Sequence, residues 1–369
     1  MSAGVEITAP ARSARAWLVP LAGRAEGVLL PLAALVTGFA AFALFLVLLG
    51  KNPWTFYTLV YQAGFGTGFS WTNTLARAAP LLLAALCVAI PARLGLVVIG
   101  GEGAIVLGGV MAGGLGAVLG GWPALIAMPL MALGAALIGG LWIGAVGALR
   151  QWRGVNETIA SLLMAYIAIA LMNHLVEGPL RDAASLNKPS TAPLAEALRV
   201  GDMPGFSVHW GLAVAFLACI GAWVLIERTT LGFSARIAGG NVRAAQVQGL
   251  PVTKLVVGFT ALGGACAGLA GYFEVSAVHG SANASLAAGY GYTGILIAFL
   301  ARHNPLAIIP VALLLAGIEA SSGLVQRRME LPDATMTVLQ GFIFVAILAS
   351  ETFTGRLDLT RWLSRGERA

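Results

Sequence analysis

The sequence predicts an all-α fold, a polytopic bundle of about ten transmembrane helices with both chain ends in the cytoplasm. The first observation is composition: 58% of the 369 residues are hydrophobic and 10% are charged, against about 25% charged residues in soluble domains. The second is a mean hydropathy of +0.86. The third is a series of charge-free apolar runs, most of them long enough to cross a bilayer. Together these observations exclude a water-soluble globule and a disordered chain.

The charge-free runs give the number of spans, because a helix needs about 20 residues to cross the hydrocarbon layer. The longest run, 103–149, contains the turn signal Gly120-Gly121-Trp122-Pro123 and is therefore divided into two helices. The run 52–76 is rich in Gly, Thr, Ser and Trp, so its first half is not expected to span. The eighth and ninth helices are short enough for partial re-entry. The ten expected helices are 28–49, 72–91, 95–119, 123–148, 156–176, 209–227, 255–276, 288–301, 305–320 and 334–350.

The distribution of Lys and Arg orients these helices through the positive-inside rule. With both ends inside, 15 of the 22 Lys and Arg residues fall in cytoplasmic segments. This orientation predicts a cytoplasmic tail 1–27, a transmembrane domain 28–350 and a cytoplasmic tail 351–369. The loop 177–208 is then extracytoplasmic and the loop 228–254 cytoplasmic. Small-residue spacing predicts close helix packing at Gly109/Gly113, Gly116/Gly120, Gly140/Gly144 and Gly264/Gly268.

Several kinds of chemistry are absent from the sequence. The three lysines are followed by Asn52, Pro189 and Leu255, never by Ser or Thr, so the chain has no P-loop for ATP. The four His residues lack metal-ligand spacing, and no nucleophile–base pair stands out. Basic residues are not interleaved with aromatic ones, which argues against nucleic acid. We therefore expect no catalytic site, no metal site and no cofactor bound by this chain.

Acidic side chains inside predicted spans are candidates for a solute path, because ionisable groups in a membrane are costly and often functional. Glu102 lies between Gly101 and Gly103 at the start of the third span, where glycine permits an unwound or closely packed backbone. The alternative is an interfacial carboxylate that pairs with Arg93 or with a helix N-terminus. Both readings stay open.

Other polar residues also have either a structural role or a place in the solute path. Asn156 and Glu157 open the fifth predicted helix, where an N-cap and a first-turn carboxylate are structural roles. Glu274 lies near the predicted outer end of its helix, where it is expected to reach water. The candidates for the translocation path are therefore Gly101, Glu102, Gly103, Asn156, Glu157 and Glu274.

The loop 228–254 is the longest predicted cytoplasmic connection. Asn241 is predicted to cap a short helix over 242–248, and Gly249 to end it. A short, mildly basic helix that projects from a bundle is suited to the groove of a partner protein. An ordinary connecting loop is the alternative.

This loop also carries a family resemblance. Its pairs Gly240-Asn241, Ala244-Ala245 and Gly249-Leu250, after Thr230-Leu231-Gly232, resemble the ATPase-contacting loop of permeases in binding-protein-dependent ABC importers. The branch resembled is the simple-sugar, nucleoside and branched-chain amino-acid group, and most closely its nucleoside-type permeases. Further resemblances, from about residue 70 to 350, are Ile99-Gly100-Gly101-Glu102-Gly103, Gly154-Val155-Asn156-Glu157 with Tyr166, Gly178-Pro179-Leu180, and Ala267-Gly268-Leu269-Ala270-Gly271 with Glu274.

The resemblance implies a multi-pass permease subunit of the bacterial inner (plasma) membrane, which forms the path for a nucleoside or related small polar solute. It implies three protein partners: an ATP-binding cassette ATPase that binds ATP and Mg, an extracytoplasmic solute-binding protein, and a second homologous permease in a heterodimer. It also implies that the ATPase is contacted by Thr230, Leu231, Gly232, Gly240, Asn241, Ala244, Ala245 and Gly249.

Alternative functions remain open at this stage. The nearest alternative is a permease whose solute is a simple sugar or a branched-chain amino acid. An ion-coupled secondary transporter using Glu102 and Glu274 would be favoured by an inverted repeat, which the sequence does not show. The sequence also departs from the family: Val98 and Ala104 replace an Asn and a Gln, and Ala165 replaces a polar residue. These departures predict a path with fewer hydrogen-bonding groups.

Overall fold

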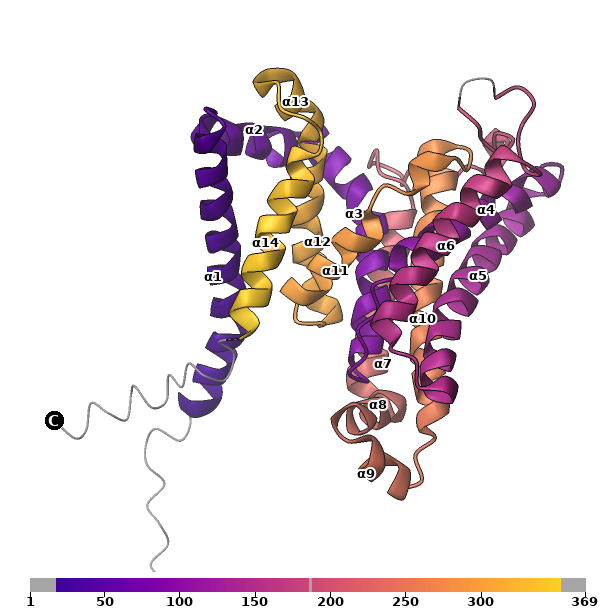
Figure 1. The fold of residues 1–369 in the computed structure, drawn as a ribbon. Coiled ribbons are helices and arrows are strands. Elements are labelled where there is room, and N and C mark those ends of the chain that lie inside the picture. The colour runs from indigo at the N-terminus through magenta and orange to yellow at the C-terminus, as the bar shows by residue number, and fades with distance from the viewer. Residues whose placement is uncertain (1–17, 186–187, 353–369) are drawn as a thin grey trace, which may run out of the picture. The chain divides into compact units, whose positions relative to one another are not determined.

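The computed structural model describes residues 18–185 and 188–352 (Figure 1). Within these ranges the chain is helical, and its only β-structure is the isolated bridges Ser190–Asn283 and Asp202–His209. The α-helices are α1 (Leu18–Leu48), α2 (Pro53–Phe65), α3 (Gly68–Ala92), α4 (Gly101–Val118), α5 (Ala124–Arg153), α6 (Glu157–Glu177), α7 (Gly211–Arg228), α8 (Thr230–Gly240), α9 (Val242–Val247), α10 (Val252–Phe273), α11 (Tyr290–Leu300), α12 (Pro305–Ala320), α13 (Ser322–Met329) and α14 (Thr335–Glu351). Three short turns complete the set: η1 (Glu196–Leu198), the π-helical η2 (Glu274–His279) and η3 (Ala284–Leu286).

The prediction of an all-α polytopic bundle is confirmed. Eight helices are long and apolar enough to cross a membrane, and two shorter apolar helices lie at 284–300 and 335–350. Each of the ten predicted helices has a counterpart among them. The eighth is short, as predicted, whereas the ninth continues through α13 into a candidate span of 25 residues, Pro305–Met329. The first candidate span begins at Leu29; most of the predicted tails, 1–17 and 353–369, lie outside the described residues.

The chain divides into two compact units. The first combines Met1–Lys51 with Thr337–Ala369. Inside this unit the ring of Phe342 lies 5.9 Å from that of Phe42 and 5.7 Å from that of Phe45. Gly38 allows close approach there, because a Cβ on it would lie 2.8 Å from Ile343 Cα. The second unit, Asn52–Met336, contains every candidate site residue.

The second unit is built around α3, which is buried continuously from Ala78 to Pro91. Glycine brings α5 and α10 together, as the spacing predicts: a Cβ on Gly140 would lie 3.0 Å from Ala261 O, and one on Gly264 would lie 2.7 Å from Ile143 Cβ. A Cβ on Gly109 or Gly113 would meet the side chains of Leu286 and Thr191 in the loops. Close helix packing also occurs at Gly109, since a Cβ on Gly271 of α10 would lie 2.6 Å from Gly109 N.

The predicted start of the third helix at 95 is wrong, because α4 begins at Gly101. Gly95 adopts a φ of +71° and stops the helical path after α3. Residues 96–99 then run without regular structure. We call residues 93–100 the α3–α4 strap.

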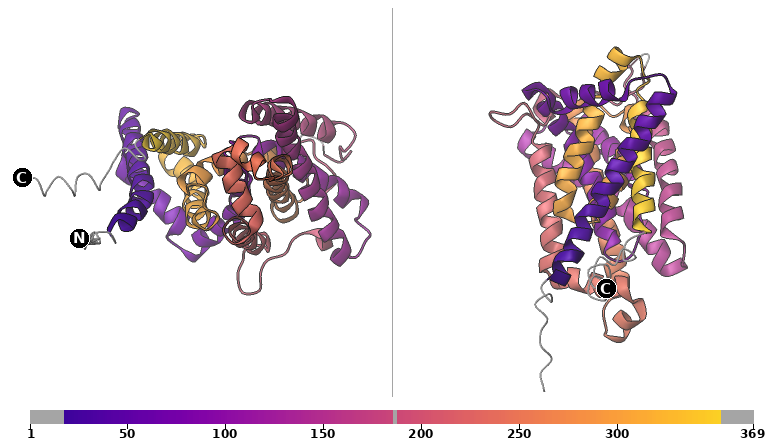
Figure 2. Two further views of the ribbon diagram at one scale, coloured as in Figure 1. Left: turned by 90° about the horizontal axis from the view of Figure 1, so that it is seen from below. Right: turned by 90° about the vertical axis from the view of Figure 1, so that its left-hand side faces the viewer.

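The second unit carries two irregular regions at opposite ends of its helices. Figure 1 shows α8 and α9 beyond the lower ends of α7 and α10, while the loop from 178 to 210 lies at the upper end. The right-hand view of Figure 2 shows the same separation. The two ends provide separate surfaces for contacts with other molecules.

Candidate functional site

The α3–α4 strap is held by side chains of α6. The Ile99 N–H donates to Ser161 Oγ at 3.0 Å, and the Thr158 hydroxyl donates to Val97 O at 2.9 Å. These bonds satisfy backbone groups that neither α3 nor α4 could satisfy. The partners are about 60 residues away in the chain, which explains why local patterns did not reveal the strap.

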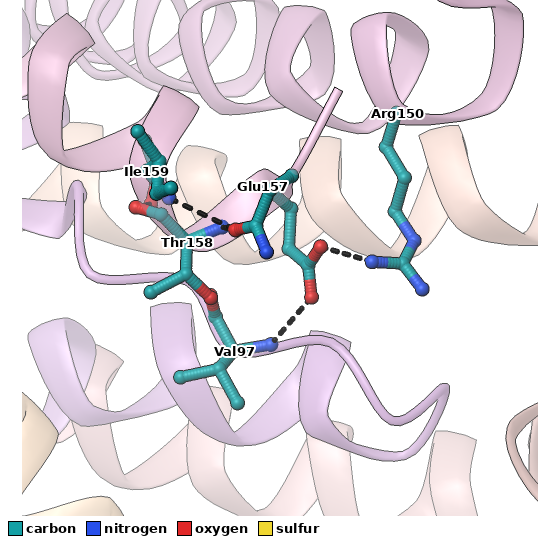
Figure 3. A network of polar contacts seen from close by, with 7 residues as sticks. Val97, Arg150, Glu157, Thr158 and Ile159 are labelled. Carbon is teal, nitrogen blue, oxygen red and sulfur yellow. Dashed lines mark hydrogen bonds and ion pairs between the residues drawn. The ribbon is translucent and has the colours of Figure 1, made fainter. Parts of the chain in front are cut away.

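The start of α6 belongs to the same network (Figure 3). Asn156 Oδ1 accepts from the N–H groups of Thr158 and Ile159, which confirms the predicted N-cap. Glu157 is buried; its carboxylate pairs with Arg150 and accepts from the Val97 N–H at 3.4 Å. Asn156 and Glu157 therefore stabilise the junction between α6 and the strap, and their part in the translocation path stays a prediction.

Glu102 connects α4 to the start of α11. Its side chain is only 1% exposed. The Gly289 and Gly291 N–H groups donate to its two carboxylate oxygens at 2.7 and 2.6 Å. The first N–H groups of a helix have no partner within the helix, and the positive end of the helix dipole favours a carboxylate there. Of the two expected partners the helix N-terminus is the correct one, and Arg93 is not used.

The glycines beside Glu102 permit this close contact. A Cβ on Gly103 would lie 2.8 Å from Ala165 Cα. A Cβ on Gly101 would touch Cys87 Sγ at 3.5 Å, and one on Gly291 would collide with the Glu102 backbone. The glycines on both sides of Glu102 thus allow α4 to approach α3, α6 and α11 together.

A second carboxylate reaches the first turn of α11. The Thr293 hydroxyl donates to Glu319 Oε1 of α12 at 3.2 Å. Glu102 and Glu319 therefore place two acidic side chains, from two other helices, along the first turn of α11.

The expectation that Glu274 reaches water is wrong, because its residue is only 2% exposed. Its carboxylate lies 3.4 Å from His279 Nε2 across the π-helical turn. The upper loop covers this turn: the N–H groups of Leu194 and Val200 donate to Gly280 O and Ser276 O at 2.8 and 3.0 Å. Burial by this loop could not be read from α10 alone.

The loop 228–254 folds into two short helices. The predicted one is confirmed as α9, with Asn241 Oδ1 accepting from the Ala244 N–H at 3.0 Å and with Gly249 at a φ of +76°. The other, α8, was not predicted. Thr229 caps it by accepting from the Gly232 N–H at 3.2 Å, and this threonine is the sequence signal that was missed.

The two helices have an inner and an outer face. Gly232, Ala235, Ala238 and Ala245 are buried within the chain. The outer face carries large apolar side chains, with Val247 90% exposed. We call the exposed set Leu231, Phe233, Val242 and Val247 the α8–α9 face. Ala244 is exposed and Ala245 is not, so only Ala244 can contact a partner directly; the expected equivalence of the two alanines is corrected by the structure.

A polar cluster lies beneath α8. Glu227 pairs with Arg236 at 3.1 Å and with Arg93 at 3.6 Å. Arg93 also donates to His303 O at 3.2 Å. Burial lowers the pKa of Arg93, against the opposing effect of Glu227. Burial and then the charge of Arg93 lower the pKa of His303 to about 4.

The three positions at which the sequence departs from the resembled motifs are all packed inside this chain. Val98, Ala104 and Ala165 are each 0% exposed. Their apolar side chains therefore lie in the packed interior around the strap and α4. Their effect on the hydrogen-bonding groups of a solute path stays a prediction.

Comparisons with known proteins agree with this architecture. The family model described as branched-chain amino acid transport system / permease component matches residues 70–348. The glucose ABC transporter permease protein TsgB13 of Haloferax volcanii is 33% identical over 93% of this chain and 91% of its own length. The guanosine ABC transporter permease protein NupP of Bacillus subtilis is 30% identical, covering 89% and 94%. The nucleoside ABC transporter permease protein NupB of Lactococcus lactis is 24% identical, covering 86% and 90%. No solved structure gives a significant match.

The matched region begins within α3 and ends within α14, so it contains the strap, the Glu102 contact and the α8–α9 pair. It also contains all or nearly all of every candidate membrane span except the first. The chain thus belongs to the family of ABC-importer permease components, and it is a multi-pass protein of the inner (plasma) membrane.

Proposed function

We propose that this chain forms the translocation path for a nucleoside or related small polar solute, and that a separate ATPase drives it through the α8–α9 face. The observation that carries this proposal is the set of exposed apolar side chains on two short capped helices at one end of the unit. An apolar patch of this kind marks a protein contact. The sequence has no P-loop, so ATP and Mg belong to the partner.

The same proposal assigns two further partners. A solute-binding protein delivers the solute at the opposite, extracytoplasmic end, where the loop 178–210 covers η2. A second, homologous permease completes the path as a heterodimer. Co-expression of the tagged chain with the neighbouring genes tests for both partner proteins by co-purification. Purification of the tagged chain without a second permease would contradict the heterodimer.

Nucleosides are the first candidate class of solute, supported by the guanosine and nucleoside permeases among the relatives. Simple sugars are the second, supported by the glucose permease. Both classes present hydroxyl donors, which suit the carboxylate of Glu319 near the first turn of α11.

Uptake by cells that express the whole transporter separates these classes. We expect labelled guanosine to accumulate in an ATP-dependent manner and unlabelled guanosine, but not glucose, to compete. Accumulation of glucose without guanosine would overturn the nucleoside assignment and leave the permease assignment intact. Accumulation of neither, with the complex assembled, would overturn both solute classes.

A further inference from the structure

The polar cluster beneath α8 joins four segments of the chain. Arg236 of α8 and Glu227 of α7 form one ion pair, at 3.1 Å, and Glu227 uses its other carboxylate oxygen for Arg93 at 3.6 Å. Arg93 begins the strap and donates to the carbonyl of His303, in the turn between α11 and α12, at 3.2 Å. The side chains of Arg236, Glu227 and Arg93 therefore connect α8 to the α11–α12 turn.

Backbone contact reinforces this connection. A Cβ on Gly239, near the end of α8, would lie 2.5 Å from Arg93 O and 3.0 Å from Leu94 Cα. Gly95 lies next to the same helix, since its Cβ would be 3.5 Å from Gly239 O. The strap is thus in direct contact with the main chain of α8, and it is also connected to α8 through Glu227 of α7.

The turn that contains His303 is hydrogen-bonded to the last turn of α11. The His303 N–H donates to Ala298 O at 2.7 Å, and the Arg302 N–H donates to Phe299 O at 2.9 Å. The His303 ring lies 4.9 Å from the Phe299 ring. Arg302 and His303 have φ values of 49° and 55°, a left-handed conformation that is unfavourable for residues with a Cβ. The turn keeps this conformation because its surroundings hold it.

The other end of α11 is held by Glu102. This helix has 11 residues, so its two ends are only about 16 Å apart at 1.5 Å per residue. A short helix of this kind moves as one body. Its end at His303 is attached to Arg93, and its start at Gly289 and Gly291 is attached to Glu102.

We propose that Arg93 is the positioning residue that transmits movement of α8 to α11, and through α11 to the Glu102 contact. This inference rests on the proposed function, in which the ATPase acts on the α8–α9 face. Arg is suited to the task because one planar guanidinium can bind a carboxylate and a carbonyl at once. A lysine ammonium is a point charge on a flexible stem and holds the same geometry less firmly.

The cluster also has unused hydrogen-bonding capacity. Arg93 Nε and His303 Nδ1 are buried, and neither makes a hydrogen bond in the part of the chain that the structure describes. The side chains of Arg93 and Glu227 are 23% and 30% exposed, so the pair is neither locked in a dry interior nor fully screened by water. Such a pair can exchange partners when α8 moves, which is what a transmitting contact requires.

The test uses the assembled complex in lipid nanodiscs or proteoliposomes, with guanosine as the solute. Arg93→Met keeps most of the side-chain packing but removes both polar contacts, and Arg93→Lys keeps the charge. We expect the amount of guanosine moved per ATP hydrolysed to fall by at least about five-fold in Arg93→Met, the lower end of typical coupling effects. Complex assembly and ATP hydrolysis should stay near wild type, and Arg93→Lys should be intermediate.

Arg153→Gln is the matched control, because Arg153 is an exposed arginine near the same end of the bundle and outside the cluster. Unchanged transport per ATP in Arg93→Met would overturn the inference while leaving the proposed function intact. If Arg93→Met does not fold, hydrogen exchange of residues 298–304 in Arg93→Lys tests whether Arg93 transmits movement to α11. We expect an ATP analogue to alter this exchange in wild type and to alter it less in Arg93→Lys; an equal response would overturn the inference. Failure of the wild-type complex to assemble or hydrolyse ATP would instead count against the proposed function.

Discussion

Replacement of Glu102 should weaken the attachment of α11 to α4 by a predictable amount. Its carboxylate accepts two backbone N–H groups, at 2.7 and 2.6 Å, in a site that is 1% exposed. A hydrogen bond to a charged group contributes about 1.5–3 kcal/mol, so the two bonds together contribute on the order of 3–6 kcal/mol. Glu102→Ala loses both bonds and leaves two buried N–H groups without an acceptor.

Glu102→Gln should have about half this effect. The amide keeps one carbonyl oxygen, but its NH₂ group presents a donor to the second backbone donor, so at most one bond survives. The expected order of uptake is therefore wild type, then Glu102→Gln, then Glu102→Ala. Membrane insertion should be normal in both variants, because removal of a charge from a span lowers the cost of insertion by up to about 3 kcal/mol.

Two measurements check this prediction. Uptake of labelled guanosine reports the effect on transport, and hydrogen exchange of the first turn of α11 reports the loss of the contact itself. Glu177→Gln is the control, since Glu177 is an exposed carboxylate at the end of α6. Normal uptake and normal exchange in Glu102→Ala, at wild-type expression, would refute the reasoning and return Glu102 to a dispensable role.

Three further predictions concern the two ends of the second unit. Cysteines at Ser185 and Ser234 should label differently in whole cells with an impermeant thiol reagent, Ser185→Cys reacting and Ser234→Cys not; the opposite pattern would reverse the proposed orientation. Ala244→Glu should abolish ATPase co-purification without unfolding the chain, whereas Ala245→Glu should lower thermal stability first, because only Ala245 is buried; equal melting temperatures would contradict this. His303 has a pKa of about 4, below its unfolded value of about 6.5, so the unfolded chain binds the proton more readily. The contribution of His303 to the free energy of unfolding should be fully present above pH 6.5, and up to about 3 kcal/mol of it should be lost as the pH falls towards 4. The free energy of unfolding of His303→Asn, in which Asn tolerates the positive φ, should decrease less over the same range. An identical pH dependence in the two proteins would exclude this histidine as the cause.

The spans were predictable because each depends on a local property, the length of a charge-free run. The cap of α9 was predictable for the same reason, since Asn241 and Gly249 act on neighbouring residues. The strap was not, because Ile99 and Val97 find their partners on α6. The apolar residues after Gly95 predict a helix when the hydrogen-bond partners on α6 are not known.

The burial of single polar residues also could not be predicted from the sequence. Glu274 is placed near a helix end by the pattern, but its turn is hydrogen-bonded by Leu194 and Val200, which belong to a loop that starts about 100 residues earlier in the chain. The difference between Ala244 and Ala245 depends on the way in which α9 lies against the rest of the chain. Sequence patterns place such residues on an element; only tertiary packing decides what the side chain contacts.

Both ends of α11 are attached to one connection between two neighbouring helices. Arg93, at the start of this connection, holds His303, and Glu102, just after its end, holds Gly289 and Gly291. The connection is also hydrogen-bonded to Ser161 of α6 through Ile99, so we expect a tilt of α11 to weaken at least one of its two attachments.

This arrangement makes a final prediction for a double-mutant cycle of Arg93→Lys and Glu102→Gln. Substitutions at distant, independent sites add to within about 0.5 kcal/mol, and Arg93 and Glu102 contact opposite ends of an 11-residue helix. If α11 moves as one body, releasing either end already frees it, and the double variant should lose less transport per ATP than the sum of the single variants. Transport assays on the four forms give the interaction free energy directly. A cycle that closes to zero would show that the two ends act independently, and transmission through α11 would then have to be abandoned.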